Sequence, residues 1–157
     1  MSNEVVEHTL ALASIAGIRE VPENRRLATL PRFFGPRMYG RAEGTIFNIA
    51  SEMVRNYRGA YWHFYTRSSS NALILVPSLG EPEDLFTIVN PEEGTEYRMH
   101  ADAIGISVCL FAYSRLSFWC DRHGVSQDTQ RFADLYHAVK DVACDHPQNQ
   151  LILQLID

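Results

Sequence analysis

The stretch GAYWHFYTRSSSNALILVPSL, residues 59–79, is the densest aromatic and β-branched run in the chain and decides the fold. Residues 61–66 and 72–76 are strand formers, and the polar residues 67–71 between them have the length of a hairpin loop. Pro77 ends the second strand because it has no N–H to donate. A two-stranded hairpin is marginally stable in water, so this one needs further strands and a helical cover.

The first strand of this hairpin carries aromatic side chains on both faces. Because side chains alternate along a strand, Tyr61, His63 and Tyr65 are expected on one face and Trp62 and Phe64 on the other. Such a strand either packs in a core or presents a stacking platform for unpaired bases. A platform is expected among many basic side chains, and the chain has a single lysine. Core packing is therefore favoured.

Two more strands are predicted after the hairpin, over residues 85–89 and 95–99. The turns that precede them, residues 80–84 and 90–94, combine Gly and Pro with carboxylates, which is typical of short connections. Together with the hairpin, these segments predict a small antiparallel sheet of three to four strands in a meander.

Several helices are expected to cover this sheet. Apolar residues at three- and four-residue spacing predict a helix over residues 41–57, ended by Gly59. From the N-cap candidate Asp102 onward the chain is apolar on all sides, as expected of a helix in the core. A further helix is predicted from Ser126 to just before Pro147, and a short one follows.

These patterns predict an α+β fold, with residues 1–157 forming a single domain. A chain of this length buries about 70% of its unfolded surface, so it needs neither a disulfide nor a metal to fold. Two segments are less regular. Residues 5–15 fit either a short helix or a strand, and residues 25–34 are expected to be broken by Pro31.

A soluble, cytoplasmic protein is expected. Glu4 and Glu7 stand where a signal peptide would carry basic residues. The longest nearly apolar run, residues 103–113, falls short of the roughly 20 residues that cross a bilayer, so no membrane contact is predicted.

No cofactor or metal is expected. The cysteines are odd in number and widely spaced, which favours reduced thiols. Cys120 with His123 and Cys144 with His146 are the nearest approach to metal-ligand spacing, and zinc needs about four ligands.

Charge is unevenly distributed along the chain. Residues 1–67 hold nine Arg and six Glu, whereas residues 68–157 hold five basic and thirteen acidic residues. Mimicry of even ten base pairs of DNA takes roughly twenty uncompensated charges, so an extended DNA mimic is excluded. Direct DNA binding is an open alternative, although overall acidity argues against tight non-specific binding; its candidate residues are Arg25, Arg26, Arg32, Arg37 and Arg41.

Hydrolase and nucleotide-binding signatures are absent from the sequence: it has no G-x-S-x-G, no P-loop and no H-E-x-x-H. An uncharacterised enzyme that uses His63 or Glu43 is a further alternative. It requires a deep pocket with convergent polar groups around those residues.

Several ordered motifs resemble the ArdB/KlcA family of antirestriction proteins, which are carried by plasmids, prophages and genomic islands. The likeness spans nearly the whole chain, and Ser69, Ser70, Asn71 and Ala72 depart from the family's usual glycine-containing turn. The motifs that carry it are LPRFFG at residues 30–35, GAYWHFY at 59–65, VP at 76–77, ADAIGISVCLFAYSRLSF at 101–118, RFADLYHAV at 131–139, DHP at 145–147 and the terminal ID.

The resemblance implies relief of type I restriction in the cell, with a host restriction-modification complex as the target and no catalytic residue set to carry over. We therefore expect a non-catalytic inhibitor that acts through a protein-binding surface, direct or indirect. The candidate contact residues are polar or acidic turn residues, with ordinary turn chemistry as the competing interpretation: Arg67, Ser69, Asn71, Glu81, Glu83, Asp84, Glu92 and Glu93.

Overall fold

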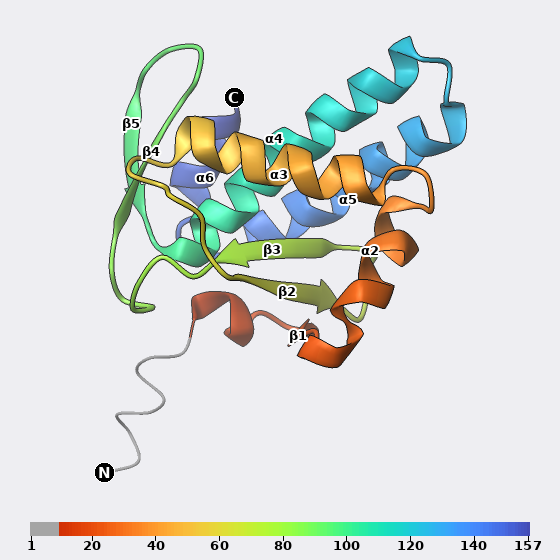
Figure 1. Ribbon diagram of the computed structural model, residues 1–157. Helices are drawn as coiled ribbons and strands as arrows, with labels where there is room; N and C mark the ends of the chain where they lie inside the picture. Colours follow the sequence, from red (N-terminus) through yellow and green to blue (C-terminus); the bar gives the residue numbers. More distant parts are fainter. Residues whose placement is uncertain (1–9) are drawn as a thin grey trace.

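The computed structural model describes residues 10–157, and this part of the chain has five α-helices and two small antiparallel sheets (Figure 1). In chain order the elements are the 3-10 helix η1 (Ala11–Ser14), β1 (Ile18–Glu20), the 3-10 helix η2 (Glu23–Arg25), α2 (Arg26–Phe34), α3 (Tyr39–Met53), β2 (Trp62–Arg67), β3 (Leu73–Pro77), β4 (Phe86–Val89), β5 (Glu96–Met99), α4 (Ala101–Arg122), α5 (Ser126–Cys144) and α6 (Asn149–Ile156). The predicted α+β class is confirmed.

The predicted hairpin is the centre of the larger sheet. β2 and β3 pair antiparallel, with Phe64 opposite Leu75. Trp62, Phe64 and Tyr65 are buried, so most of the strand's aromatic rings pack in the core, whereas Tyr61 is half exposed beneath Arg26. β1 pairs with the other edge of β2, which gives the strand order β1-β2-β3.

Helix α4 covers the free edge of β3. The Tyr113 hydroxyl donates to the Leu73 carbonyl at 2.6 Å, and the Leu75 N–H donates to Cys109 Sγ at 3.3 Å. These bonds satisfy edge groups that would otherwise be buried without partners. Burial raises the pKa of the Cys109 thiol to about 12 and lifts that of Tyr113 well above its usual value, so both stay neutral.

The predicted meander is wrong in one respect. β4 and β5 form a separate two-stranded sheet and do not extend the β2–β3 hairpin. The reason is that α4 occupies the edge of β3 where β4 would have paired, while β1 takes the remaining edge of β2. The third strand of the main sheet thus comes from the N-terminal part of the chain.

The helices differ from expectation at two places. Pro31 lies inside α2 and does not break it; the carbonyl left without a helical partner is that of Leu27, a residue that is 85% exposed and open to water. Helix α3 ends at Met53 and not at Gly59, because Val54 turns extended and forms a β-bridge with Ile88. Part of residues 5–15 lies outside the described residues, and the rest contains η1.

Helix α4 is the centre of the hydrophobic core. It packs against α3, α5, α6 and β3, and in Figure 1 it runs between α3 and α5. Its length and composition would suffice for a membrane span, but two thirds of its most apolar window are buried inside the fold (67%). The predicted core position of this helix is confirmed.

A substitution at Gly105 tests the close contact between α4 and β3. A Cβ at this residue would lie 2.5 Å from the Leu75 carbonyl oxygen and 2.9 Å from Val76 Cα, both backbone atoms that cannot rotate away. We expect Gly105→Ala to lower the free energy of unfolding by about 1–3 kcal/mol in urea titrations. Gly44→Ala is the matched control, because Gly44 lies inside α3 with open space around its Cβ position. We expect that substitution to stabilise by about 0.5–1 kcal/mol; equal effects of the two would contradict the packing argument.

Candidate functional site

Arg67, one of the predicted turn residues, connects the hairpin turn to the residue after α5 and to the segment before β1. Its guanidinium donates to Asp145 Oδ2 at 2.8 Å and to the Ala16 carbonyl at 3.0 Å, and its side chain is only 13% exposed. Ser69 and Asn71, further along the turn, are exposed. Arg67 therefore fixes the turn, and the two polar side chains are the ones presented to solvent.

The predicted acidic turns hold their own backbones in place. Asp84 Oδ2 accepts the Glu81 N–H at 3.0 Å. In the second turn, Asn90 Oδ1 accepts the N–H groups of Glu92 and Glu93 at 2.8 and 3.0 Å. The carboxylates of Glu81, Glu92 and Glu93 belong to exposed residues, as does Glu83. Ordinary turn chemistry thus accounts for the backbones and leaves these carboxylates at the surface.

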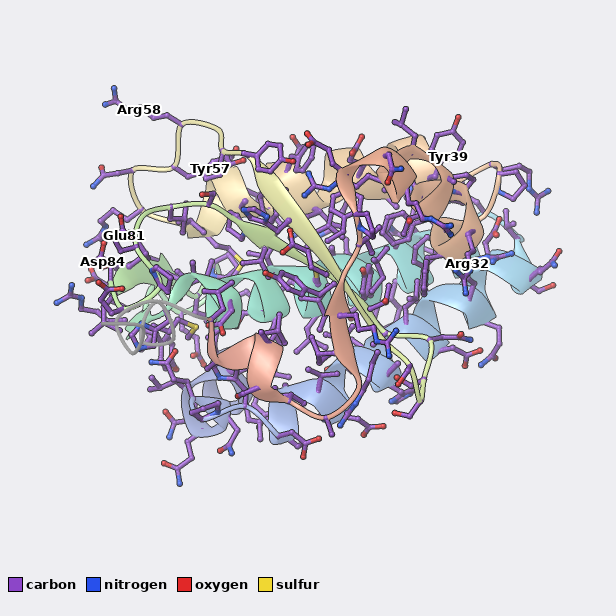
Figure 2. All side chains as sticks on the ribbon, turned by 90° about the horizontal axis from the view of Figure 1, so that it is seen from below. Arg32, Tyr39, Tyr57, Arg58, Glu81 and Asp84 are labelled. Atoms are coloured by element: carbon purple, nitrogen blue, oxygen red, sulfur yellow. The ribbon has the colours of Figure 1, made fainter. Side chains whose placement is uncertain are left out.

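The candidate residues do not form one patch. The hairpin turn lies between β2 and β3, whereas the turn of residues 80–84 follows the opposite end of β3 (Figure 1). Residues 90–94 join the far ends of β4 and β5. In Figure 2, Glu81 and Asp84 lie at one end of the molecule and Arg32 of α2 at the other.

A polar cavity of about 350 Å³ lies beside the hairpin turn, between α2 and the first half of α5. Arg32 lies on the side of α2 that faces α5 (Figure 2). Asn71 is the one predicted contact residue in its lining. The other lining residues are Arg32, Phe33, Gln127, Gln130, Arg131, Asp134 and Leu135.

A buried carboxylate organises the rim of this polar cavity. Asp128, 3% exposed, lies 3.5 Å from Arg131 Nε and 3.3 Å from Arg37 Nη2. It stands in the first turn of α5, where a negative charge is stabilised by the helix dipole. One buried carboxylate thus holds two guanidinium groups.

A second hollow, of about 430 Å³, lies along the outer side of α4 and is called here the α4 groove. Phe111, Arg115, Phe118 and Arg122 line it from α4, and the predicted contact residue Glu92 lines it from the β4–β5 turn. Phe118 is 68% exposed although it belongs to the central core helix. The α4 groove therefore combines an exposed aromatic side chain with charges of both signs.

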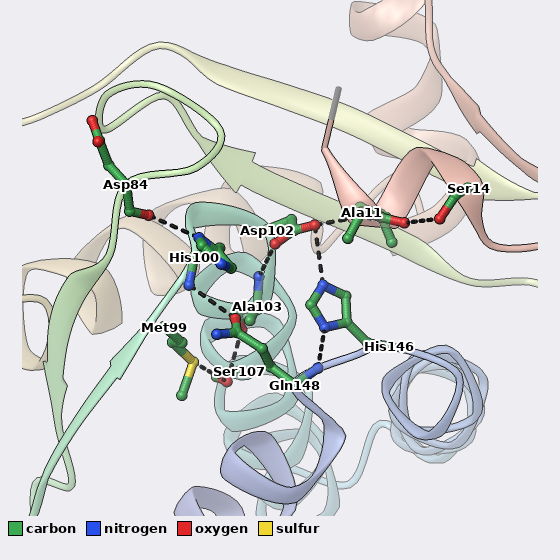
Figure 3. Close-up of polar contacts among 11 residues, drawn as sticks. Ala11, Ser14, Asp84, Met99, His100, Asp102, Ala103, Ser107, His146 and Gln148 are labelled. Carbon is green, nitrogen blue, oxygen red and sulfur yellow. Dashed lines mark hydrogen bonds and ion pairs between the residues drawn. The ribbon is translucent and has the colours of Figure 1, made fainter. Parts of the chain in front are cut away.

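A buried polar cluster pins the start of α4 (Figure 3). Asp102 Oδ2 accepts the Leu12 N–H at 2.8 Å and lies 3.0 Å from His146 Nε2, while Asp102 Oδ1 accepts the Ala103 N–H. The Gln148 N–H donates to His146 Nδ1 at 2.9 Å, which places the ring proton on Nε2. Both side chains are buried, so this carboxylate–histidine pair is structural.

The enzyme alternative gains no support from the geometry. His63 Nδ1 lies 2.9 Å from Glu20 Oε2 on the surface of β2, and neither His63 nor Glu43 lines any of the cavities described above. Within residues 10–157, no group of three or more His, Cys, Asp or Glu side chains is placed to hold a metal ion.

The candidate DNA-binding arginines are spread over η2, α2, the α2–α3 turn and α3. Arg26 bonds the Tyr61 hydroxyl and stacks on the Tyr61 and Phe64 rings, and Arg41 lies 4.1 Å over the Trp119 ring. Direct DNA binding through these arginines stays a prediction.

Residue patterns gave no signal for the polar cavity and a single one for the α4 groove. Arg131, Gln130 and Asp134 look like the polar face of an amphipathic helix, and only the packing of α2 beside α5 converts them into a lining. Phe118 looks like one more apolar residue of a core helix. A heptad-like row at residues 111, 115, 118 and 122 is the one signal that marks an outward side of α4.

Comparison with known proteins shows which family the chain resembles. Residues 55–157 match the model of a family described as antirestriction protein. The chain is 34% identical over 137 residues to the antirestriction protein KlcA of Escherichia coli, covering 87% of this chain and 92% of that protein.

The chain belongs to the antirestriction protein family. A further relative of this antirestriction chain is the uncharacterized protein YafX of Escherichia coli, which is 30% identical and covers 89% of this chain and 87% of that protein. The predicted family resemblance is confirmed.

A solved structure supports the same assignment at the level of the fold. It matches with a TM-score of 0.76 at 30% identity and covers 89% of this antirestriction chain and 95% of that one. It comes from work describing a novel fold for KlcA and ArdB, with antirestriction activity against Type I DNA restriction systems in vivo but not in vitro.

The Asp102 carboxylate predicts a pH dependence of stability. Burial raises its pKa, but the His146 contact and the two backbone N–H donors outweigh burial, so the pKa lies below its ordinary value. A lowered folded-state pKa adds stability above the unfolded-state pKa of about 3.9, and this contribution is lost as the pH falls through the folded-state pKa.

We expect Asp102→Asn to lower the free energy of unfolding by about 1–3 kcal/mol near neutral pH. The difference in free energy of unfolding between this variant and the unsubstituted protein should become smaller below about pH 4, where the carboxylate becomes protonated. Urea titrations over that range measure both effects. Asp121→Asn, at an exposed residue at the other end of α4, is the control and should change little; a gap that stays constant with pH would count against the assignment.

Proposed function

We propose that this chain relieves type I restriction of incoming DNA in the cytoplasm, as a non-catalytic inhibitor that binds protein. The observation that carries the proposal is the likeness, over 89% of the chain, to the KlcA/ArdB structure. The activity stated for those proteins was found in vivo but not in vitro. The target is the host type I restriction-modification complex, reached directly or through another cell component.

The charge arrangement supports protein binding over extended DNA mimicry. The two acidic turns lie at the two ends of the β4–β5 hairpin, other exposed acids such as Glu52 and Asp121 lie elsewhere, and basic side chains stand among them. Arg55, for example, donates to Glu96 Oε2 at 2.7 Å. A DNA mimic needs a continuous row of uncompensated charges, which these separated turns do not provide.

The α4 groove, with the adjoining turn that carries Glu92 and Glu93, is the proposed contact surface. Aromatic and arginine side chains dominate the binding energy of protein interfaces, and Phe118 lies between Arg115 and Arg122 along α4. Phe118 adds little to the core because it is 68% exposed. That Glu81, Glu83 and Asp84 of the other acidic turn also contact the target protein stays a prediction.

Relief of restriction is tested by phage plating on cells with an active type I system. We expect unmodified phage to plate with higher efficiency when this protein is expressed, and modified phage to plate equally with and without it. Modified phage controls for effects on infection itself. Unchanged plating of unmodified phage, with the folded protein present in the cells, would refute the proposed function.

The α4 groove is tested in the same assay with Phe118→Asp. A buried charge at the centre of an interface weakens binding by 2 kcal/mol or more, so relief should fall by about tenfold or more. Leu27→Asp is the matched control: Leu27 is an apolar residue, 85% exposed, on α2. Both variants should unfold at the temperature of the unsubstituted protein. Full relief by Phe118→Asp, or equal loss in both variants, would remove the α4 groove from the mechanism.

A further inference from the structure

We infer that the polar cavity between α2, the hairpin turn and α5 binds a small ligand that carries a carboxylate or a phosphate group. The inference goes beyond the proposed function, because it concerns a different face of the molecule and a small anion in place of a protein. It rests on how the cavity holds its arginines, on its charge balance and on its remaining donors.

Arg131 is anchored before any ligand arrives. Asp128 is buried and lies 3.5 Å from Arg131 Nε, so it fixes the guanidinium at the cavity wall. Gly35 permits this placement: it has a positive φ of 86°, and a Cβ there would lie 3.0 Å from Nε and 3.2 Å from Cζ. Within residues 10–157, this buried Nε makes no hydrogen bond. The Asp128 ion pair and the close approach to Gly35 restrict this side chain, and a restricted arginine loses less conformational entropy when it binds an oxyanion.

Positive charge exceeds negative charge around the cavity. The guanidinium groups of Arg32 and Arg131 line it, and Arg37 shares the Asp128 carboxylate with Arg131. The opposing acid of the lining, Asp134, accepts a hydrogen bond from Gln130 Nε2 at 2.8 Å. The lining itself thus carries two arginines and one carboxylate, and the N-terminus of the 19-residue helix α5 adds partial positive charge.

The remaining lining suits a small anion. Asn71, Gln127 and Gln130 provide amide groups, and two arginines can each offer paired N–H donors to a carboxylate or a phosphate. Phe33 and Leu135 supply apolar wall, and the volume of about 350 Å³ falls within the range of small-molecule sites. The cavity therefore has the size, charge and donors of an oxyanion site.

The test is a titration of the full chain followed by amide-resolved NMR, with inorganic phosphate and citrate as the probes. Sodium chloride at equal ionic strength is the reference, because it reports non-specific screening. We expect saturable shifts confined to the signals of Arg32, Asn71, Gln127, Gln130 and Arg131 with at least one probe. Shifts that equal those of sodium chloride with both probes would overturn the inference.

Two substitutions sharpen this test. Arg32 is exposed, so Arg32→Ala should fold normally and weaken binding by about tenfold or more through the loss of a charged donor. Arg58→Ala is the matched control, an exposed arginine at the end of the molecule opposite Arg32 (Figure 2) that should leave binding unchanged. Unaltered affinity of Arg32→Ala, or equal weakening by both variants, would overturn the site.

The two probes also separate the two ligand chemistries. Arg32→Lys keeps the charge but removes the planar pair of N–H donors, so it should weaken most the binding of the probe that Arg32 holds through two parallel hydrogen bonds, phosphate or citrate. If Arg32→Lys binds phosphate and citrate as tightly as the unsubstituted chain, the arginine pair attracts anions by its charge alone. Because the readout is binding to the purified chain, its outcome is independent of the phage assay.

Discussion

The close crossing of α4 over the edge of β3 is the constraint on which the rest of the structure depends. At Gly105 the helix backbone comes so near to Leu75 that a Cβ would overlap its carbonyl oxygen. One and two helical turns later, Cys109 and Tyr113 reach the polar groups of the same strand edge. The row of residues 105, 109 and 113 therefore replaces the neighbouring strand that a sheet edge normally needs. A longer side chain at the first of these residues would lift α4 off the edge and leave its buried polar groups unpaired.

This crossing also determines where the surface features lie. Because α4 occupies the edge of β3, the β4–β5 hairpin forms its own sheet, and its acidic turn comes to stand over the outer side of α4. The α4 groove exists for this reason. On the other side of the molecule, α5 packs along α4 and brings its first turns beside α2, which creates the polar cavity. The α4 groove and the polar cavity thus both follow from the position of α4, and different kinds of side chain line them.

Burial decides which polar groups serve the fold and which are open to partners. Asp102 and His146 resemble a catalytic pair in residue type, yet both are enclosed and join η1, the start of α4 and the α5–α6 connection. Arg67 at the hairpin turn also serves the fold, because its guanidinium donates hydrogen bonds to Asp145 and to the Ala16 carbonyl. Phe118 and Glu92, in contrast, are exposed at the surface. In this member of the antirestriction family the buried pair thus serves stability.

The sequence by itself determined the hairpin, the core helix, the two C-terminal helices, the α+β class and the family, because these follow from local periodicity and from ordered motifs. It also excluded an extended DNA mimic by charge count alone. Tertiary structure decided the strand partners, because any strand edge can pair with any other and only the position of α4 removes one choice. It decided too that Pro31 stays in a helix, four residues after the highly exposed Leu27. The polar cavity joins Arg32 with Arg131, 99 positions apart, the α4 groove joins Glu92 with Arg122, 30 positions apart, and no local pattern encodes either meeting.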